Sequence, residues 1–190
     1  PSRPAPRTVA PAPVPPATVS RTADGAVTVR AVRIPEGLSI DGRLDESFYR
    51  EIPAIDGFIQ QDPVEGAPET EKTEAWIFFD ADNLYVSARC WDSHPEREIA
   101  DEMRRDANGI LQNESFTVIL DTFNDKRNGV FFQTNSLGAQ RDVAVTDELN
   151  VNQDWNTVWE VKTQRFDQGW SVEFAIPFKS LRYNSDPVQV

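Results

Sequence analysis

Acidic side chains gather at three places in the sequence where turn-forming residues are common. These groups are Asp80 with Asp82, Asp121 with Asn124 and Asp125, and Asp142 with Asp147. Carboxylate and amide oxygens are the ligands that Ca²⁺ prefers. None of the groups has the spacing of a dedicated calcium loop, and Asp and Asn are also ordinary turn formers. Asp121, Asn124 and Asp125 are therefore candidate calcium ligands, with turn formation as the alternative role.

Side chains suited to covalent catalysis or to zinc are scarce. The single cysteine, Cys90, lies in an alternating apolar run, which favours a buried structural thiol over a nucleophile. The chain has no glycine-rich phosphate loop, no cluster of Cys and His, and no nucleophile beside a recognisable base. Acids are plentiful, but nothing singles out two of them as a glycosidase pair. We therefore expect no catalytic residue, no cofactor-binding residue and no enzyme.

Flat aromatic rings are the remaining candidates for ligand contact. The five tryptophans are Trp76, Trp91, Trp155, Trp159 and Trp170. Four of them fall in predicted strands or on a predicted hairpin, where packing in the core is the usual role of so large a side chain. Trp155 instead lies between Asp154 and Asn156 in a polar loop. It is the tryptophan we expect to be exposed, and the candidate for stacking on a ligand.

The elements that must position these side chains are mostly strands. The predicted strands span residues 25–34, 73–79, 84–91, 115–121, 129–135, 140–146, 157–164 and 169–176. Helical signals are few and cover residues 45–50, 96–105 and a turn at 178–181. Many short strands separated by Gly, Asn and Asp turns are typical of an antiparallel β-sandwich. The sequence therefore predicts an all-β fold with few short helices.

The first 24 residues differ in composition from the rest. Half of the 14 prolines lie in the first 16 residues, with no large aliphatic or aromatic side chain other than valine between them. Such a segment cannot bury enough surface to fold alone and favours extended polyproline II. We therefore divide the chain into an extended arm, residues 1–24, and a β-sandwich, residues 25–190. A simple flexible linker is the alternative for the arm.

The charges follow nearly the same division. Residues 1–33 hold five arginines and one acid, a net charge of +4, whereas residues 34–190 carry −16. The acidic body argues against nucleic acid and against broad contact with anionic lipid, and only the arm suits an anionic surface. The residues we expect to bind a partner are Arg3, Pro4, Arg7, Pro15, Pro16 and Arg21.

No apolar run approaches the 20 residues of a membrane-spanning helix. The sequence has no initiator methionine and begins in a low-complexity stretch, as after removal of an export signal, although a chain boundary of another origin would look the same. We expect an exported protein, periplasmic or at the cell envelope and peripheral to the membrane.

Several runs resemble, in order and spacing, the family 9 carbohydrate-binding module, in the branch found at the front of large bacterial envelope proteins. The runs span residues 40–46, 73–76, 79–86, 120–123, 135–138, 154–159 and 169–178. The resemblance covers about residues 38–190. It implies a jelly-roll-like sandwich, an exported protein and no catalysis.

The resemblance also implies where a sugar would bind. In sugar-binding members of the family two tryptophans sandwich the ligand. The first of these positions matches Leu111 here, and the second lies beyond Val190. Sugar binding by the family's usual mode is therefore not expected. Related sandwich domains bind haem between a methionine and a histidine, but His94 and Met103 lie too close in sequence to reach opposite sides of a haem easily.

A sandwich that stops at Val190 would lack its last strand and expose an edge. We expect residues 25–34 or a strand from a partner to fill it. The leading hypothesis is a non-catalytic docking subunit that binds the exposed face of a larger, membrane-bound protein complex. The alternative is a carbohydrate-binding module at the cell envelope, and an electron-transfer haem domain comes third. Residues 104–106 (Arg-Arg-Asp) are expected to supply a buried Arg–Asp pair that pins a loop.

Overall fold

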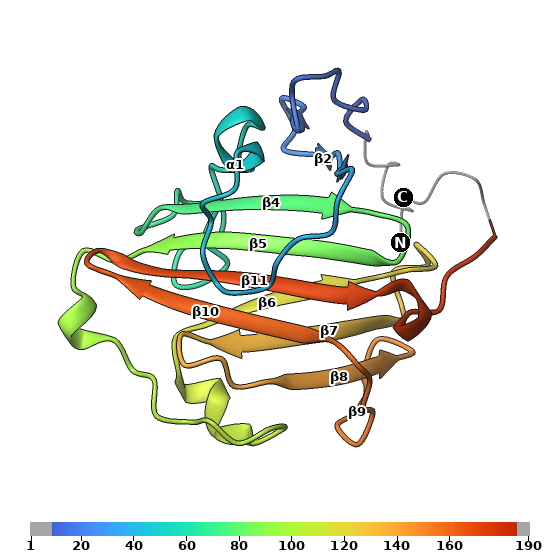
Figure 1. The fold of residues 1–190 in the computed structure, drawn as a ribbon. Helices are drawn as coiled ribbons and strands as arrows, with labels where there is room; N and C mark the ends of the chain where they lie inside the picture. Colours follow the sequence, from blue (N-terminus) through green and yellow to red (C-terminus); the bar gives the residue numbers. More distant parts are fainter. Residues whose placement is uncertain (1–8, 186–190) are drawn as a thin grey trace.

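The computed structural model describes residues 9–185, and two stacked sheets make up most of it (Figure 1). One sheet has the strand order β10-β11-β5-β4-β3, and the other has the order β6-β7-β8-β9. The strands of the first sheet are β3 (Val32–Arg33), β4 (Thr73–Phe79), β5 (Asn83–Trp91), β10 (Glu160–Phe166) and β11 (Gly169–Pro177). Those of the second are β6 (Ser115–Leu120), β7 (Gly129–Asn135), β8 (Arg141–Thr146) and β9 (Asn150–Asn152). All neighbours are antiparallel except β3 and β4, so the predicted all-β sandwich is confirmed.

The hairpins form because their tips carry residues that suit tight turns. Asp80 closes the β4–β5 turn, since its Oδ1 accepts the N–H groups of Asp82 at 2.7 Å and Asn83 at 2.8 Å. Gly169 begins β11 at a φ of +142°, and a Cβ there would lie 2.0 Å from the carbonyl oxygen of Cys90. Only glycine fits where this backbone crosses so close to β5.

The main core lies between the two sheets. Its largest members are Phe132 from β7, Trp159 directly before β10, and Trp170 and Phe174 from β11. The rings of Trp159 and Phe174 stack at 5.6 Å between centroids, and Phe132 meets Trp159 edge-on at 5.3 Å. Trp76 is buried as well, on the other face of the five-stranded sheet. The predicted packing role is therefore confirmed for Trp76, Trp159 and Trp170, while Trp91 is partly buried.

Residues 34–54 cover the outer face of the five-stranded sheet and include the short helix α1 (Phe48–Glu51). Glu173 of β11, fully buried beneath them, fastens this segment. Its carboxylate accepts the N–H groups of Asp41 at 3.0 Å and Gly42 at 2.9 Å, and the hydroxyl of Tyr49 at 2.9 Å. Burial raises the pKa of the Glu173 carboxyl to about 7 in spite of these bonds.

The helix predicted at residues 96–105 is wrong. Only 3₁₀ turns occur there, η1 (Pro95–Arg97) and, further on, η2 (Asn108–Gln112). Side chains take the backbone donors that a helix would use: Asn113 accepts the N–H groups of residues 101 and 102, and Glu102 accepts those of residues 103 and 104. Such local bonds compete with the helical ladder. The helical turns expected near residues 45–50 and 178–181 are present as α1 and η3 (Phe178–Ser180).

The single strand predicted at residues 25–34 is also wrong, because it divides between two sheets. Its first part, β2 (Val27–Val29), pairs with β1 (Val19–Arg21) in a separate hairpin that turns at Gly25. Its second part, β3, runs parallel to β4 and occupies an edge of the five-stranded sheet. Part of the predicted segment thus forms one short edge strand of the five-stranded sheet.

Part of the predicted arm lies against the body. Thr18 and Ala10 are buried, and the hydroxyl of Thr18 donates to the carbonyl oxygen of Pro53 at 2.9 Å. The Thr28 hydroxyl in turn donates to the carbonyl oxygen of Ala10. Within residues 9–185, no helix is both long and apolar enough to cross a membrane.

Candidate functional site

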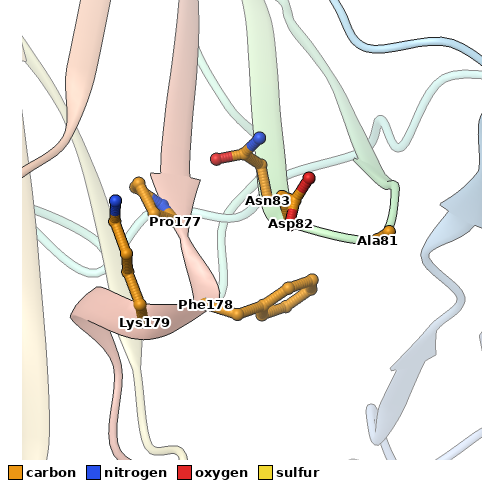
Figure 2. Close-up of a pocket in the computed structure, with 6 residues that line it drawn as sticks. All are labelled: Ala81, Asp82, Asn83, Pro177, Phe178 and Lys179. Carbon is orange, nitrogen blue, oxygen red and sulfur yellow. The ribbon is translucent and has the colours of Figure 1, made fainter.

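An open pocket of about 340 Å³ lies where β4 turns into β5 and β11 ends. Its lining residues are Ala81, Asp82, Asn83, Pro177, Phe178 and Lys179. Figure 2 shows the Phe178 ring extending from η3 toward the turn at Ala81 and Asp82. One wall is the β4–β5 turn and the other is the junction of β11 with η3. The register of β5 against β11 holds them together, because Asn83 pairs with Pro177 and the Phe178 N–H donates to the Asp82 carbonyl oxygen at 2.8 Å.

The polar side chains of this pocket are largely without protein partners. Neither the Asp82 carboxylate nor the Lys179 ammonium group makes a hydrogen bond or ion pair with any residue between 9 and 185. Asn83 uses its Nδ2 to donate to the Tyr85 hydroxyl at 3.2 Å, so its Oδ1 stays available. The pocket therefore offers an aromatic ring, a carboxylate, an amide oxygen and an ammonium group to a ligand.

The sequence prediction missed this pocket. The sequence indicates only a metal-binding or turn-forming pair at Asp82 and a turn at Phe178. The signal that could have found it is the aromatic residue directly after Pro177, at a strand end. Its pairing with the β4–β5 tip depends on the register of β5 against β11, which the sequence does not reveal.

Leu111, which is predicted from the resemblance to match the first sandwiching tryptophan, lies on η2. The element η2 is at the opposite end of the sandwich from the pocket (Figure 1). Its side chain is 53% exposed. The polar groups beside it are saturated: buried Asn135 donates to the Glu102 carbonyl oxygen at 2.7 Å and to Asn113 Oδ1 at 2.8 Å. Asn135 Oδ1 also accepts the N–H groups of Leu137 and Ala139 at 3.1 Å. This region holds structure together and presents no aromatic platform at Leu111.

Arg105 pins its loop, as expected, but its buried partner is Asp142 of β8 rather than Asp106. The Asp142 side chain is fully buried, and its Oδ1 accepts Arg105 Nη2 at 2.5 Å and Trp159 Nε1 at 3.0 Å. Asp142 Oδ2 accepts the N–H of Thr157 at 2.8 Å. Arg104 instead pairs with Glu102 at 2.9 Å, with its side chain mostly in solvent.

Trp155 is partly buried rather than exposed. Its ring packs edge-on against Phe132, with 6.1 Å between centroids, at the margin of the main core. The loop folds back because Arg105 donates to the Asn156 side chain at 2.9 Å and to the Thr157 carbonyl oxygen at 3.2 Å. Core packing therefore leaves only part of this ring for a ligand.

The calcium candidates serve the β6–β7 loop. Asp121 accepts the N–H groups of Asp125 and Lys126 at 3.2 and 2.7 Å, and Asp125 accepts those of Arg127 and Asn128 at 2.8 Å each. Asn124 adopts a left-handed backbone with a φ of 51°. Across the described part of the chain, no group of three or more His, Cys, Asp or Glu residues is arranged to hold a metal. The turn-forming alternative accounts for the geometry of all three.

His94 and Met103, the two residues considered for haem, are both exposed and lie nine residues apart in the same irregular segment. The His94 Nδ1 atom is 3.4 Å from the Glu96 carboxylate. Cys90 is partly buried, and burial raises the pKa of its thiol to about 12, which disfavours the reactive thiolate. The burial of Cys90 agrees with a structural thiol.

The predicted partner-binding residues are only partly within the described chain. Arg3, Pro4 and Arg7 lie outside residues 9–185. Pro15 and Pro16 are exposed, whereas Arg21 donates from its guanidinium to the carbonyl oxygen of Asp56. The contact of Arg21 is thus with the protein's own body.

Comparison with protein families matches residues 40–190 to the carbohydrate family 9 binding domain-like model. The chain therefore belongs to this family. The fold is similar to that of a carbohydrate-binding module family 9 protein from Caldicellulosiruptor kristjanssonii, solved with cellotriose and with glucose. The cellotriose complex has a TM-score of 0.53 and 15% identity, and the match covers 84% of this chain and 70% of that one. The glucose complex has a TM-score of 0.53 and 16% identity, and the match covers 83% of this chain and 73% of that one. A comparison with curated proteins gives no match.

Proposed function

We propose that this family 9 domain is a non-catalytic carbohydrate-binding module. The observation that carries the proposal is the family match over residues 40–190, on a sandwich similar to one solved with cellotriose and glucose. The sandwich leaves an open pocket with an aromatic wall and unpaired polar groups, the combination that recognises a sugar's apolar face and its hydroxyls. The protein acts after export, at the cell envelope, where it meets polysaccharide.

A glycan array tests this function. We expect the folded protein to bind one class of oligosaccharide, and heat-denatured protein to bind none. An array on which the folded protein gives no more signal than the denatured control would contradict carbohydrate binding.

Docking on a protein complex is the second candidate, and the outer face of the four-stranded sheet supports it. Ile119 and Phe131 lie opposite each other there, and Val145 lies opposite Val151. Ile119 is 58% and Val151 is 55% exposed. Contiguous apolar side chains on a sheet surface are typical of an interaction site. Purification from a gentle detergent extract tests this candidate, and recovery of the protein alone would count against it.

A further inference from the structure

We propose that the open pocket between the β4–β5 turn and η3 binds a neutral sugar residue, with the Phe178 ring as its stacking platform. The inference rests on the proposed function and deepens it, because it assigns the place of binding and the chemical class of the sugar. It locates binding at the opposite end of the sandwich from η2, the element that carries Leu111 (Figure 1).

The pocket is held in shape before any ligand arrives. The Asp82–Phe178 hydrogen bond and the β5–β11 pairing join its two walls. The Ser180 hydroxyl donates to the Val158 carbonyl oxygen at 2.7 Å and anchors the far end of η3. The Tyr183 ring meets Phe178 edge-on at 6.2 Å between centroids. The Phe178 ring, held in this way, loses little conformational entropy on binding.

The pocket's chemistry suits hydroxyl groups beside an apolar ring face. Aromatic side chains cover apolar C–H surface, and Phe178 is only partly buried. The Asp82 carboxylate and Asn83 Oδ1 accept hydrogen bonds, and Lys179 donates them. Since these groups have no partner among residues 9–185, a sugar would not have to displace a protein bond. A volume of about 340 Å³ is at the small end of the usual range for ligand pockets, about 300–1,000 Å³, and suits one or two sugar rings.

The charges favour a neutral sugar over a uronic acid. Asp82 and Lys179 carry opposite charges, and Asp80, bonded to the backbone of the same turn, adds a negative one. The whole chain has a net charge of −12. An anionic sugar would approach a surface of its own sign, which costs affinity and slows association.

Isothermal titration calorimetry of the whole chain with cellotriose, mannotriose and tri-galacturonic acid tests the proposal. We expect at least one neutral sugar to bind, and tri-galacturonic acid to bind at least about tenfold more weakly. Phe178→Ala and Asp82→Ala should each weaken the neutral sugar at least about tenfold, because each removes a ligand contact. Phe178→Tyr should retain binding.

Matched controls are Phe58→Ala, which removes an aromatic ring of 38% exposure from another loop, and Leu111→Ala. Neither should change the affinity, and near-ultraviolet circular dichroism checks that every variant is folded. A neutral sugar whose binding survives Phe178→Ala, or is lost with Leu111→Ala, would overturn the inference while the proposed function stands. Tighter binding of tri-galacturonic acid would overturn the assignment to neutral sugars. No heat with any of the three sugars would overturn the inference, and the glycan array then decides whether the proposed function stands.

Discussion

Two loop regions lie at opposite ends of the sandwich (Figure 1). They differ in whether their polar side chains have hydrogen-bond or ion-pair partners in the protein. In residues 101–114, Glu102, Asn113 and Arg105 are all engaged with one another, with the backbone or with Asp142. At the β4–β5 turn and η3, the Asp82 and Lys179 side chains have no partner in the described chain. A saturated buried group stabilises the fold, whereas an unsaturated group beside a pocket is available to a ligand. The predictions for Asp142, Asp80 and Asp82 test this contrast directly.

The largest expected effect is that of Asp142→Ala. The substitution leaves Arg105, Trp159 Nε1 and the Thr157 N–H without their acceptor. The Arg105 side chain is 36% exposed and can be hydrated, whereas a hydrogen bond to a charged group contributes about 1.5 to 3 kcal/mol, so we expect a total loss of about 3 to 5 kcal/mol. Urea denaturation measures the loss. The control is Asp154→Ala, which removes an exposed carboxylate and should change stability by no more than about 0.5 kcal/mol. Equal stabilities of the two variants would contradict a structural role for this region.

The next effect is the pH dependence that Glu173 contributes. Its pKa is raised from 4.5 to about 7 in the folded protein, so its contribution to stability is fully present below about pH 4.5 and is lost as the pH rises through 7. Glu173→Gln should remove this dependence. The stability of the native chain relative to the variant should fall by roughly 2 to 3 kcal/mol from about pH 4.5 to about pH 8. Parallel stability curves for the two proteins would show that the carboxyl titrates normally.

A smaller effect separates two acids within one turn. Asp80 accepts bonds from the Asp82 and Asn83 N–H groups and, at 2.7 Å, from the Tyr85 hydroxyl. Asp80→Ala should therefore cost about 1 to 2 kcal/mol in thermal or urea unfolding. Asp82→Ala should cost less than about 0.5 kcal/mol, since its side chain has no partner to lose. The contrast fails if Asp82→Ala destabilises the protein as much as Asp80→Ala.

Leu111→Ala should also have a small effect. Half of the side chain is exposed and no ligand contact is assigned to it, so stability should change by less than about 1 kcal/mol. Differential scanning calorimetry measures this change. A large loss of stability would mean that Leu111 packs more tightly than its exposure indicates.

The sequence predicts most strands but not the side-chain contacts that hold the irregular segments against the sheets. The strands β4, β5 and β11 are predictable because successive side chains point to opposite faces of a sheet, even though both faces of β11 are buried. Residues 96–105 have a composition that favours a helix, but they do not form one. The side chains of Asn113 and Glu102 accept hydrogen bonds from backbone N–H groups that a helix would use. Those contacts depend on tertiary position, as does the partly buried state of Trp155. The pocket escaped prediction for the same reason, since strand register brings Phe178 to Asp82.

The central claim is that a neutral sugar occupies the pocket at Phe178. The most direct test is a two-dimensional amide NMR titration of the ¹⁵N-labelled chain with cellotriose, with amide signals assigned. The account predicts the largest shift changes at Asp82, Asn83, Phe178 and Lys179, and none at Leu111. Changes confined to residues 101–114, with the pocket signals unmoved, would contradict it.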